Sequence, residues 1–271
     1  MYGAMLGDMI GAPYEFDRGK KSKNFEMFND AVHFTDDTVM TVAVADALLH
    51  CTKDVSERKC KRALVHFLKK WGKKYPNAGY GSSFSAWLRS PLSKPYNSCG
   101  NGSAMRVSAV PYLFADTSLA RVREVARWTA EITHDHPEGV KGAEATASAI
   151  WLALHGAGKT EIKAYIISKF GYNLSRTCDE IRPSYRHTEL CQETVPEAIT
   201  AFLEAEDFED VIRTAVSLGG DCDTLTAIAA SIGAAYYHIP DYFVTQCWKR
   251  LTPDIKKVVT RVAAKSPVSI V

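Results

Sequence analysis

The chain has 271 residues and a mass of 29.9 kDa, with 46% hydrophobic and 24% charged residues. This is the composition of an ordinary globular protein, and it excludes a disordered chain, a collagen-like repeat and a disulfide-rich miniprotein. Lysine and arginine total 33 against 31 acidic residues, so the formal net charge is only +2. Proteins that wrap nucleic acid show a larger and more clustered basic excess, so we expect no stable nucleic-acid complex.

The sequence also bears on the cellular compartment. No stretch approaches the roughly 18 consecutive apolar residues that a membrane-spanning helix needs, so we expect no membrane contact. The segment Met1–Glu15 contains Asp8 and Glu15 and lacks a basic start, which is unlike a signal peptide. The seven cysteines are an odd number without a C-x-x-C pair, a pattern typical of reduced thiols. We therefore predict a cytoplasmic protein, and we expect a monomer.

Helical periodicity dominates the chain, and alternating β-patterns are nearly absent. Predicted helices, in chain order, span Thr38–His50, Val55–Tyr75, Ser118–Thr133, Gly139–His155, Thr194–Glu206, Phe208–Leu218, Thr224–His238 and Tyr242–Leu251. Thr117 and Asp207 are the expected N-caps of two of them. Three long stretches, Ala12–Phe34, Tyr75–Asn101 and Gly171–Glu193, are predicted to be irregular. We predict an all-α fold in one domain, residues 1–271.

Two acidic motifs stand at the starts of very apolar helices. Thr35-Asp36-Asp37-Thr38 leads into the first predicted helix, and Asp221-Cys222-Asp223-Thr224 leads into the helix that begins at Thr224. Each motif taken alone is most simply explained by N-capping, because Asp and Thr satisfy the free N–H groups at helix starts. Two paired-acid motifs on buried helices favour a second interpretation, since buried carboxylates need counter-charge and no Lys or Arg is adjacent in sequence.

A metal centre would supply that charge. Carboxylates and threonine hydroxyls are hard oxygen donors, which Mg²⁺, Mn²⁺ and Ca²⁺ prefer, and neither motif contains a histidine. Four negative charges balance two divalent ions, the arrangement of many hydrolytic centres. Cys222 stands between two aspartates and can instead point into the core as a small apolar side chain.

Two further segments are candidate binding elements. The run Pro95–Arg106 (PYNSCGNGSAMR) places small residues before an apolar segment, where backbone N–H groups can approach a phosphate; a plain turn with a helix cap is the alternative. Thr133–Pro137 contains an H-x-H pair, His134 and His136, for which zinc binding or catalysis competes with simple hydrogen bonding at a turn.

Taken in order, these motifs resemble the ADP-ribosylglycohydrolase family, which includes dinitrogenase-reductase-activating glycohydrolase and the ADP-ribosylhydrolases. The resemblance covers nearly the whole chain through GAMLGDMIGAPYEF, FTDDTVM, GYGSSFSAWL, PYNSCGNGSAMR, ITHDHPEG and SLGGDCDTLTAIAASIGAAYY. It implies an all-α orthogonal multi-helix bundle with a dinuclear centre of two Mg²⁺, with Mn²⁺ as the alternative metal.

The resemblance also assigns roles to individual residues. It implies metal ligation by Thr35, Asp36, Asp37, Asp221, Asp223 and Thr224, and contacts to ADP-ribose from Asn97, Ser98, Cys99, Gly100, Asn101 and His134. Glu15 matches an acidic residue near the scissile bond of some members, and we expect Glu15, Asp36, Asp37 and Asp223 to be catalytic. Cys99 departs from the family pattern, because many relatives carry an aromatic residue there.

The implied reaction is metal-dependent hydrolysis of the glycosidic bond between ADP-ribose and a modified acceptor, through an oxocarbenium-like transition state. The favoured acceptor is a protein side chain, with arginine slightly preferred. Release of ADP-ribose from a nucleobase or a small metabolite is one alternative. A non-catalytic ADP-ribose-binding relative is another, although the four intact aspartates speak against it.

Overall fold

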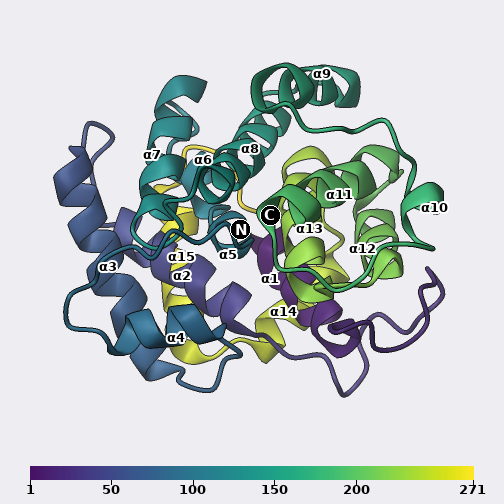
Figure 1. Cartoon of the computed structure of the whole chain (residues 1–271), viewed down its shortest axis with the longest axis horizontal. Helices are drawn as coiled ribbons and strands as arrows, with labels where there is room; N and C mark the ends of the chain where they lie inside the picture. The colour runs from purple at the N-terminus through teal and green to yellow at the C-terminus, as the bar shows by residue number, and fades with distance from the viewer.

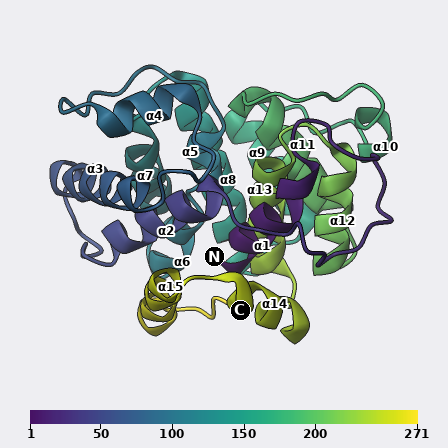
Figure 2. The same cartoon turned by 90° about the horizontal axis from the view of Figure 1, so that it is seen from below.

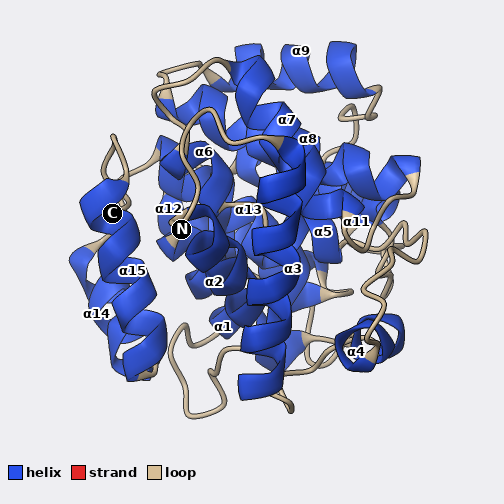
Figure 3. Cartoon of the chain, turned by 90° about the vertical axis from the view of Figure 1, so that its left-hand side faces the viewer, coloured by secondary structure: helices blue, strands red, loops and turns tan.

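The computed structural model describes residues 1–271 and consists of helices joined by loops (Figure 3). Its helices are α1 (Tyr2–Gly11), η1 (Ala12–Tyr14, a short 3-10 helix), α2 (Asp36–Leu48), α3 (Glu57–Lys74), α4 (Ser82–Arg89), α5 (Gly102–Met105), α6 (Ala109–Leu113), α7 (Leu119–Glu131), α8 (Pro137–Leu154), α9 (Lys159–Phe170), α10 (Cys178–Ile181), α11 (Cys191–Glu204), α12 (Phe208–Leu218), α13 (Cys222–Tyr236), α14 (Asp241–Arg250) and α15 (Pro253–Lys265). The β-pairing is limited to one isolated bridge between Gly100 and Leu190. The all-α prediction is confirmed.

All eight predicted helices are present, as α2, α3, α7, α8 and α11–α14. The predicted irregular stretch Tyr75–Asn101 is wrong in part because it contains α4, whose apolar Phe84, Trp87 and Leu88 are buried. Its serine-rich sequence has weak helix propensity, so packing decides its conformation. Hydrophobic periodicity also does not predict α1, which is buried on every side, or α10, which lies within the predicted irregular stretch Gly171–Glu193. Nor does it predict α9 and α15, which lie at the surface and bury only a narrow apolar face.

One predicted cap is confirmed and one is wrong. Asp207 caps α12, since its side chain accepts a hydrogen bond from the Asp210 amide at 2.8 Å. The cap of α7 is Ser118, whose hydroxyl accepts from the Arg121 amide at 3.2 Å, whereas the Thr117 hydroxyl donates to the Phe114 carbonyl. The two neighbouring residues are equally good caps in isolation, and the path of the preceding turn selects between them.

Helices α1 and α13 lie side by side at the centre of the molecule (Figure 1). Three glycines on one face of α1 allow the two backbones to touch. A Cβ atom on Gly3 would stand 2.0 Å from the Ala230 carbonyl oxygen, and one on Gly7 would stand 2.3 Å from that of Thr226. Gly11 meets the Cys222 carbonyl oxygen in the same way, at 2.6 Å. This contact brings the end of α1 against the start of α13, where the second acidic motif lies.

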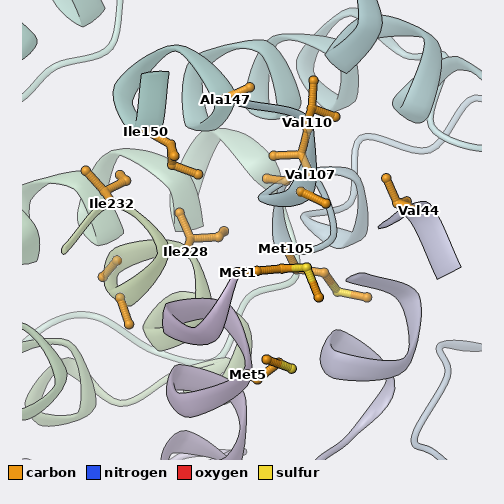
Figure 4. Packing of buried hydrophobic residues seen from close by; sticks show 14 of the residues in the cluster. Met1, Met5, Val44, Met105, Val107, Val110, Ala147, Ile150, Ile228 and Ile232 are labelled. Carbon is orange, nitrogen blue, oxygen red and sulfur yellow. The ribbon is translucent and has the colours of Figure 1, made fainter. Parts of the chain in front are cut away.

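The apolar core surrounds this central pair. Met1, the N-cap of α1, and Met5 of α1 lie near Ile228 of α13 and near Met105, which ends α5 (Figure 4). The buried apolar side chains form one cluster of 82 residues. The single domain expected from the sequence stays a prediction.

Most of the remaining helices lie on three sides of the central pair. In Figure 2, α2, α3, α4 and α7 occupy one side, α9–α12 occupy the other, and α14 with α15 lie along a third. None of the helices combines the length and the apolar character needed to cross a membrane. The starts of α2 and α13, which carry the two acidic motifs, come together between the first two of these sides.

Candidate metal centre and substrate cavity

The first acidic motif begins α2 and directs its carboxylates away from the helix backbone. Thr35 is the N-cap, and its hydroxyl oxygen accepts a hydrogen bond from the Asp37 amide at 3.3 Å. The aspartates are therefore not needed as caps. Asp37 Oδ2 accepts from the Thr224 hydroxyl at 3.0 Å, while Asp37 Oδ1 is buried without any hydrogen-bond partner. This unpaired oxygen fits a metal ligand better than it fits a cap.

Asp8 of α1 holds the start of α2 in place. Its carboxylate accepts from the Thr35 hydroxyl at 2.7 Å, and from the amides of Thr35 and Thr38, each at 3.0 Å. Asp8 is fully buried, and this burial together with repulsion from Asp223 raises its pKa to about 6. No sequence motif assigns a role to Asp8. The available signal was that Asp8 is the only charged side chain between Met1 and Tyr14.

The second acidic motif begins α13. Asp221 occupies the N-cap position but makes no side-chain cap hydrogen bond, and its Oδ2 accepts from the Asn101 side chain at 2.6 Å. Asp223 Oδ1 accepts from the Thr224 amide at 2.9 Å. The Cys222 sulfur lies in the core near the Thr226 hydroxyl, 3.9 Å away, so it is not directed toward the carboxylates. The apolar interpretation of Cys222 is confirmed.

The two motifs and Glu15 form one acidic cluster. Carboxylate oxygens of Glu15, Asp221 and Asp223 lie within 4.8 Å of one another. Thr35 and Thr224 connect the cluster to the α2 motif, because the Thr35 hydroxyl lies 3.4 Å from Asp223 Oδ2 and the Thr224 hydroxyl reaches Asp37.

Burial and mutual repulsion govern the protonation of this cluster. Burial first, and then repulsion from Asp223, raise the pKa of Asp36, Asp37 and Asp221 well above the usual range, and the same causes raise the pKa of Glu15 to about 7. Burial likewise raises the pKa of Asp223. No lysine or arginine forms an ion pair with any of these five carboxylates. The donor set is therefore all oxygen, negatively charged and without a protein counter-ion, which fits hard divalent cations.

A strained turn holds Glu15 over the cluster. Phe16 and Asp17 have φ angles of +60° and +56°, in the left-handed region that non-glycine residues rarely adopt. The Asp17 carboxylate accepts from the Gly220 amide at 2.9 Å and from the His187 amide at 3.0 Å. These two hydrogen bonds attach the Glu15 segment both to the turn before α13 and to the loop before α11.

A cavity of about 210 Å³ opens beside the acidic cluster. Its lining includes the acidic motif residues Glu15, Asp36, Asp37, Asp221, Asp223 and Thr224, together with Ser98, Gly100, Asn101 and His134. Asn101 joins the two groups, because its side chain donates to Asp221. Of the predicted metal ligands, Thr35 lies behind this lining. Of the predicted ADP-ribose contacts, Asn97 and Cys99 do not line the cavity.

The positions of Asn97 and Cys99 follow from the backbone path of their loop. Asn97 is exposed, has a φ of +53°, and donates its amide to the Asp135 carboxylate at 2.7 Å. Cys99 accepts the Cys191 amide at its carbonyl, 2.9 Å away, in the short ladder that pairs Gly100 with Leu190. Alternate residues of the extended segment Ser98–Gly100 face opposite sides, so Ser98 and Gly100 reach the cavity while Cys99 does not. Asn97 precedes this segment in a left-handed conformation and lies outside the cavity lining.

Some backbone N–H groups of the glycine-rich run Pro95–Arg106 donate hydrogen bonds to acceptors within the protein. The Gly100 amide donates to the Ser98 hydroxyl at 3.0 Å, and the Asn101 amide donates to the Glu189 carbonyl at 2.7 Å. The Gly102 and Ser103 amides at the start of α5 have no protein acceptor, which leaves them available to an anionic ligand.

The H-x-H pair separates in the structure. His134 lines the cavity, whereas His136 caps α8, with its Nδ1 accepting from the Glu138 amide at 3.1 Å. The zinc alternative considered for this pair therefore has no geometric basis. The cavity lining also includes Ser82, Ser83, Phe84 and Glu189, to which no sequence motif assigns a role, and Tyr96 and Arg106 from the candidate binding run Pro95–Arg106.

Comparison with known proteins agrees with this geometry. A model of the ADP-ribosylglycohydrolase family matches residues 1–268. The chain is 26% identical to ADP-ribosylhydrolase ARH3 of Homo sapiens over 90% of this chain and 87% of that protein. It is 24% identical to ADP-ribosylarginine hydrolase Tri1 of Pseudomonas putida (strain GB-1), over 98% of this chain and 77% of that protein.

A solved structure described as an ADP-ribosylglycohydrolase-related protein complex has the same fold. It superposes with a TM-score of 0.72 at 21% identity and covers 97% of this chain and 95% of its own. With the family model matching nearly every residue, the chain belongs to the ADP-ribosylglycohydrolase family and is an enzyme that hydrolyses ADP-ribose linkages.

Proposed function

We propose that this enzyme removes ADP-ribose from a modified protein side chain by metal-dependent hydrolysis of the glycosidic bond, with arginine as the favoured acceptor. The observation that carries the proposal is the buried acidic cluster, which has no protein counter-ion and faces the cavity beside Ser98, Asn101 and His134. Such a cavity offers cation ligands beside neutral polar groups, as a nucleotide sugar requires.

The metal ligands that we propose are Thr35, Asp36, Asp37, Asp221, Asp223 and Thr224. The all-oxygen donor set and the unpaired Asp37 Oδ1 fit Mg²⁺, with Mn²⁺ as the alternative, and four aspartates balance two ions. When bound, the ions would supply Lewis acidity, which polarises water and ribose hydroxyls.

The protein side chains then have separable roles. Glu15 is half-buried at the rim of the acidic cluster, close to Asp221 and Asp223, where it can hold or release a proton beside the anomeric carbon. Asp36, Asp37 and Asp223 place negative charge where an oxocarbenium-like transition state becomes positive. Ser98, Gly100, Asn101 and His134 would orient the ADP-ribose diphosphate.

The preference for arginine depends on the relative from Pseudomonas putida, which is named an ADP-ribosylarginine hydrolase and matches 98% of this chain. We further propose a cytoplasmic location, because all seven cysteines are free thiols in the structure. A monomer remains our expectation.

A panel of defined substrates tests the acceptor. Release of free ADP-ribose is measured from an arginine-modified protein, a modified nucleobase and a modified metabolite, with Mg²⁺ and with EDTA. We expect the fastest release from arginine and its loss in EDTA. Faster release from the nucleobase or the metabolite would contradict the acceptor, and equal rates in EDTA would contradict the metal requirement.

Calorimetric titration tests the orientation of the ligand in the cavity. Free ADP-ribose should bind as the product, and AMP should bind more weakly because it lacks the second ribose. EDTA should weaken ADP-ribose binding much more than AMP binding. Equal affinities that EDTA leaves unchanged would mean that the terminal ribose does not reach the acidic cluster.

A further inference from the structure

His134 is buried between the protein interior and the cavity. The residue is 6% exposed, and its Nδ1 lies 2.7 Å from the hydroxyl oxygen of Thr133. Its Nε2 has no protein partner and faces the two glycines of the Gly100-Asn101-Gly102 segment. A Cβ atom on Gly102 would stand 3.0 Å from Nε2, and one on Gly100 would stand 3.5 Å away. The glycines therefore leave this nitrogen accessible from the cavity.

The proton of the Thr133 hydroxyl has a single good acceptor. The Ala130 carbonyl is 3.5 Å away and already accepts the amides of Thr133 and His134, at 3.0 Å and 2.7 Å. Both lone pairs of that carbonyl are thereby engaged. The Nδ1 atom of His134, at 2.7 Å, is the remaining acceptor.

Arg106 fixes the orientation of the same hydroxyl. It is 1% exposed, and one of its terminal NH₂ groups donates to the Thr133 hydroxyl oxygen at 2.7 Å and to the Thr129 carbonyl at 2.8 Å. A guanidinium has no acceptor, so the Thr133 hydroxyl cannot donate to Arg106 and must direct its own proton elsewhere.

We infer that Arg106 and Thr133 form a hydrogen-bond relay that holds His134 in the neutral tautomer with its proton on Nε2. His134 then presents a fixed N–H donor to the cavity. This inference rests on the proposed function for the identity of the acceptor, which would be an oxygen of the ADP-ribose diphosphate. Thr133 and Arg106 are positioning residues, because they act on the ligand only through His134.

The surroundings of His134 keep the ring neutral as well as oriented. Burial, and secondly the charge of Arg106, lower the pKa of His134 well below its usual value. A neutral imidazole has one donor and one acceptor nitrogen. Because the Thr133 hydroxyl donates to Nδ1, Nε2 carries the proton and is the donor. The alternative tautomer would present a lone pair to an anionic ligand and repel it.

Nitrogen-15 NMR of histidine-labelled protein tests the relay without any ligand. A His134→Asn variant identifies the signals of His134 among the eight histidines. We expect the wild-type long-range ¹H–¹⁵N spectrum to show a protonated Nε2 and an unprotonated Nδ1. A protonated Nδ1 in the wild type would overturn the inference, whatever the variants do.

Three threonine variants extend the test to binding. Thr133→Val should mix the tautomers and weaken ADP-ribose binding about tenfold, the equivalent of one hydrogen bond. Thr133→Ser should restore both properties. Thr129→Val is the matched control, because Thr129 contacts Arg106 only through its backbone carbonyl.

Wild-type affinity in Thr133→Val would overturn the relay. An Nε2-protonated His134 in an enzyme that does not bind ADP-ribose would support the relay and contradict the proposed function.

Discussion

Two groups of buried polar residues beside the cavity differ in how their charge is balanced. We call the aspartate cluster the acidic end and the Arg106–Thr133–His134 group the other end. At the acidic end, Asp36, Asp37, Asp221 and Asp223 face one another without a protein cation, and Asp37 Oδ1 has no partner. At the other end, Arg106 is equally buried, but two protein oxygens accept from it and orient it toward Thr133. The acidic end is thus incomplete without external cations, whereas the other end is organised before any ligand arrives.

This contrast has a functional consequence. Electrostatic repulsion among buried carboxylates lowers the stability of the metal-free protein and favours cation binding. Preorganised donors at the opposite end lower the cost of fixing a ligand. Substitutions at the acidic end should therefore change metal binding and turnover, whereas substitutions at the other end should change ligand affinity.

The largest effect should come from removing charge at the acidic end. Asp36→Asn and Asp223→Asn should each reduce hydrolysis more than about a hundredfold, beyond the 10–100-fold typical of residues that only support a metal ligand. Steady-state rates at saturating Mg²⁺ measure this loss, with far-ultraviolet circular dichroism as the folding control. Near-normal turnover in both variants would show that these aspartates act only as parts of the helix starts.

The second effect concerns the residue that supports the acidic end from α1. Asp8→Asn should lower the free energy of unfolding by about 1–3 kcal/mol. The new NH₂ group would face the amides or the hydroxyl that now donate hydrogen bonds to Asp8, and two donors cannot pair. Displacement of Thr35 should also reduce activity about 10–100-fold. Denaturant unfolding and rates at saturating Mg²⁺ measure the two changes, and a variant with wild-type stability would contradict this role for Asp8.

The third effect is on stability as a function of pH in the absence of metal. The folded-state pKa values of Asp8 and Glu15, about 6 and about 7, exceed ordinary carboxyl values near 4. The native state therefore binds more protons than the unfolded state between about pH 4 and pH 7, so its stability falls as pH rises through this window.

Thermal melting in EDTA at pH 5 and pH 8 checks this expectation. The melting temperature should be lower at pH 8 by at least about 3 °C, the equivalent of about 1 kcal/mol for a chain of this size. Mg²⁺ should recover most of that loss at pH 8 and little at pH 5. The melting temperature should depend less on pH in Asp223→Asn. A melting temperature that rises from pH 5 to pH 8 would contradict the idea that repulsion among the buried carboxylates destabilises the metal-free protein.

The smallest effect belongs to the other end of the cavity. Gly102→Ala should weaken ADP-ribose binding by roughly tenfold or less, because its Cβ would stand 3.0 Å from His134 Nε2 and cover that donor. Gly81→Ala is the matched control, since Gly81 also lines the cavity but its Cβ would meet no atom within 4 Å. Calorimetric titration compares the two, and equal affinities would show that Nε2 does not contact the ligand.

The sequence by itself determined most of the helices that bury a broad apolar face, but not α1, whose glycine-rich segment is buried on every side. It also located both acidic motifs, because hydrophobic periodicity and acidic pairs at helix starts are local properties of the chain. The sequence did not identify α9 or α15, whose buried faces are narrow, or α4, whose helix depends on packing. Local pattern is weak evidence when a neighbour supplies the stabilisation.

Tertiary structure alone decided how these pieces meet. Three glycines let α1 touch α13, Asp8 of the same helix reaches Thr35 at the start of α2, and Asn101 reaches Asp221 across 120 residues of chain. The extended backbone at Ser98–Gly100 directs Ser98 toward the cavity, whereas Asn97, in a left-handed conformation, is exposed. The Arg106–Thr133–His134 relay likewise joins segments 27 residues apart. Such contacts depend on side-chain direction and on packing between distant segments, which no local pattern of residues encodes.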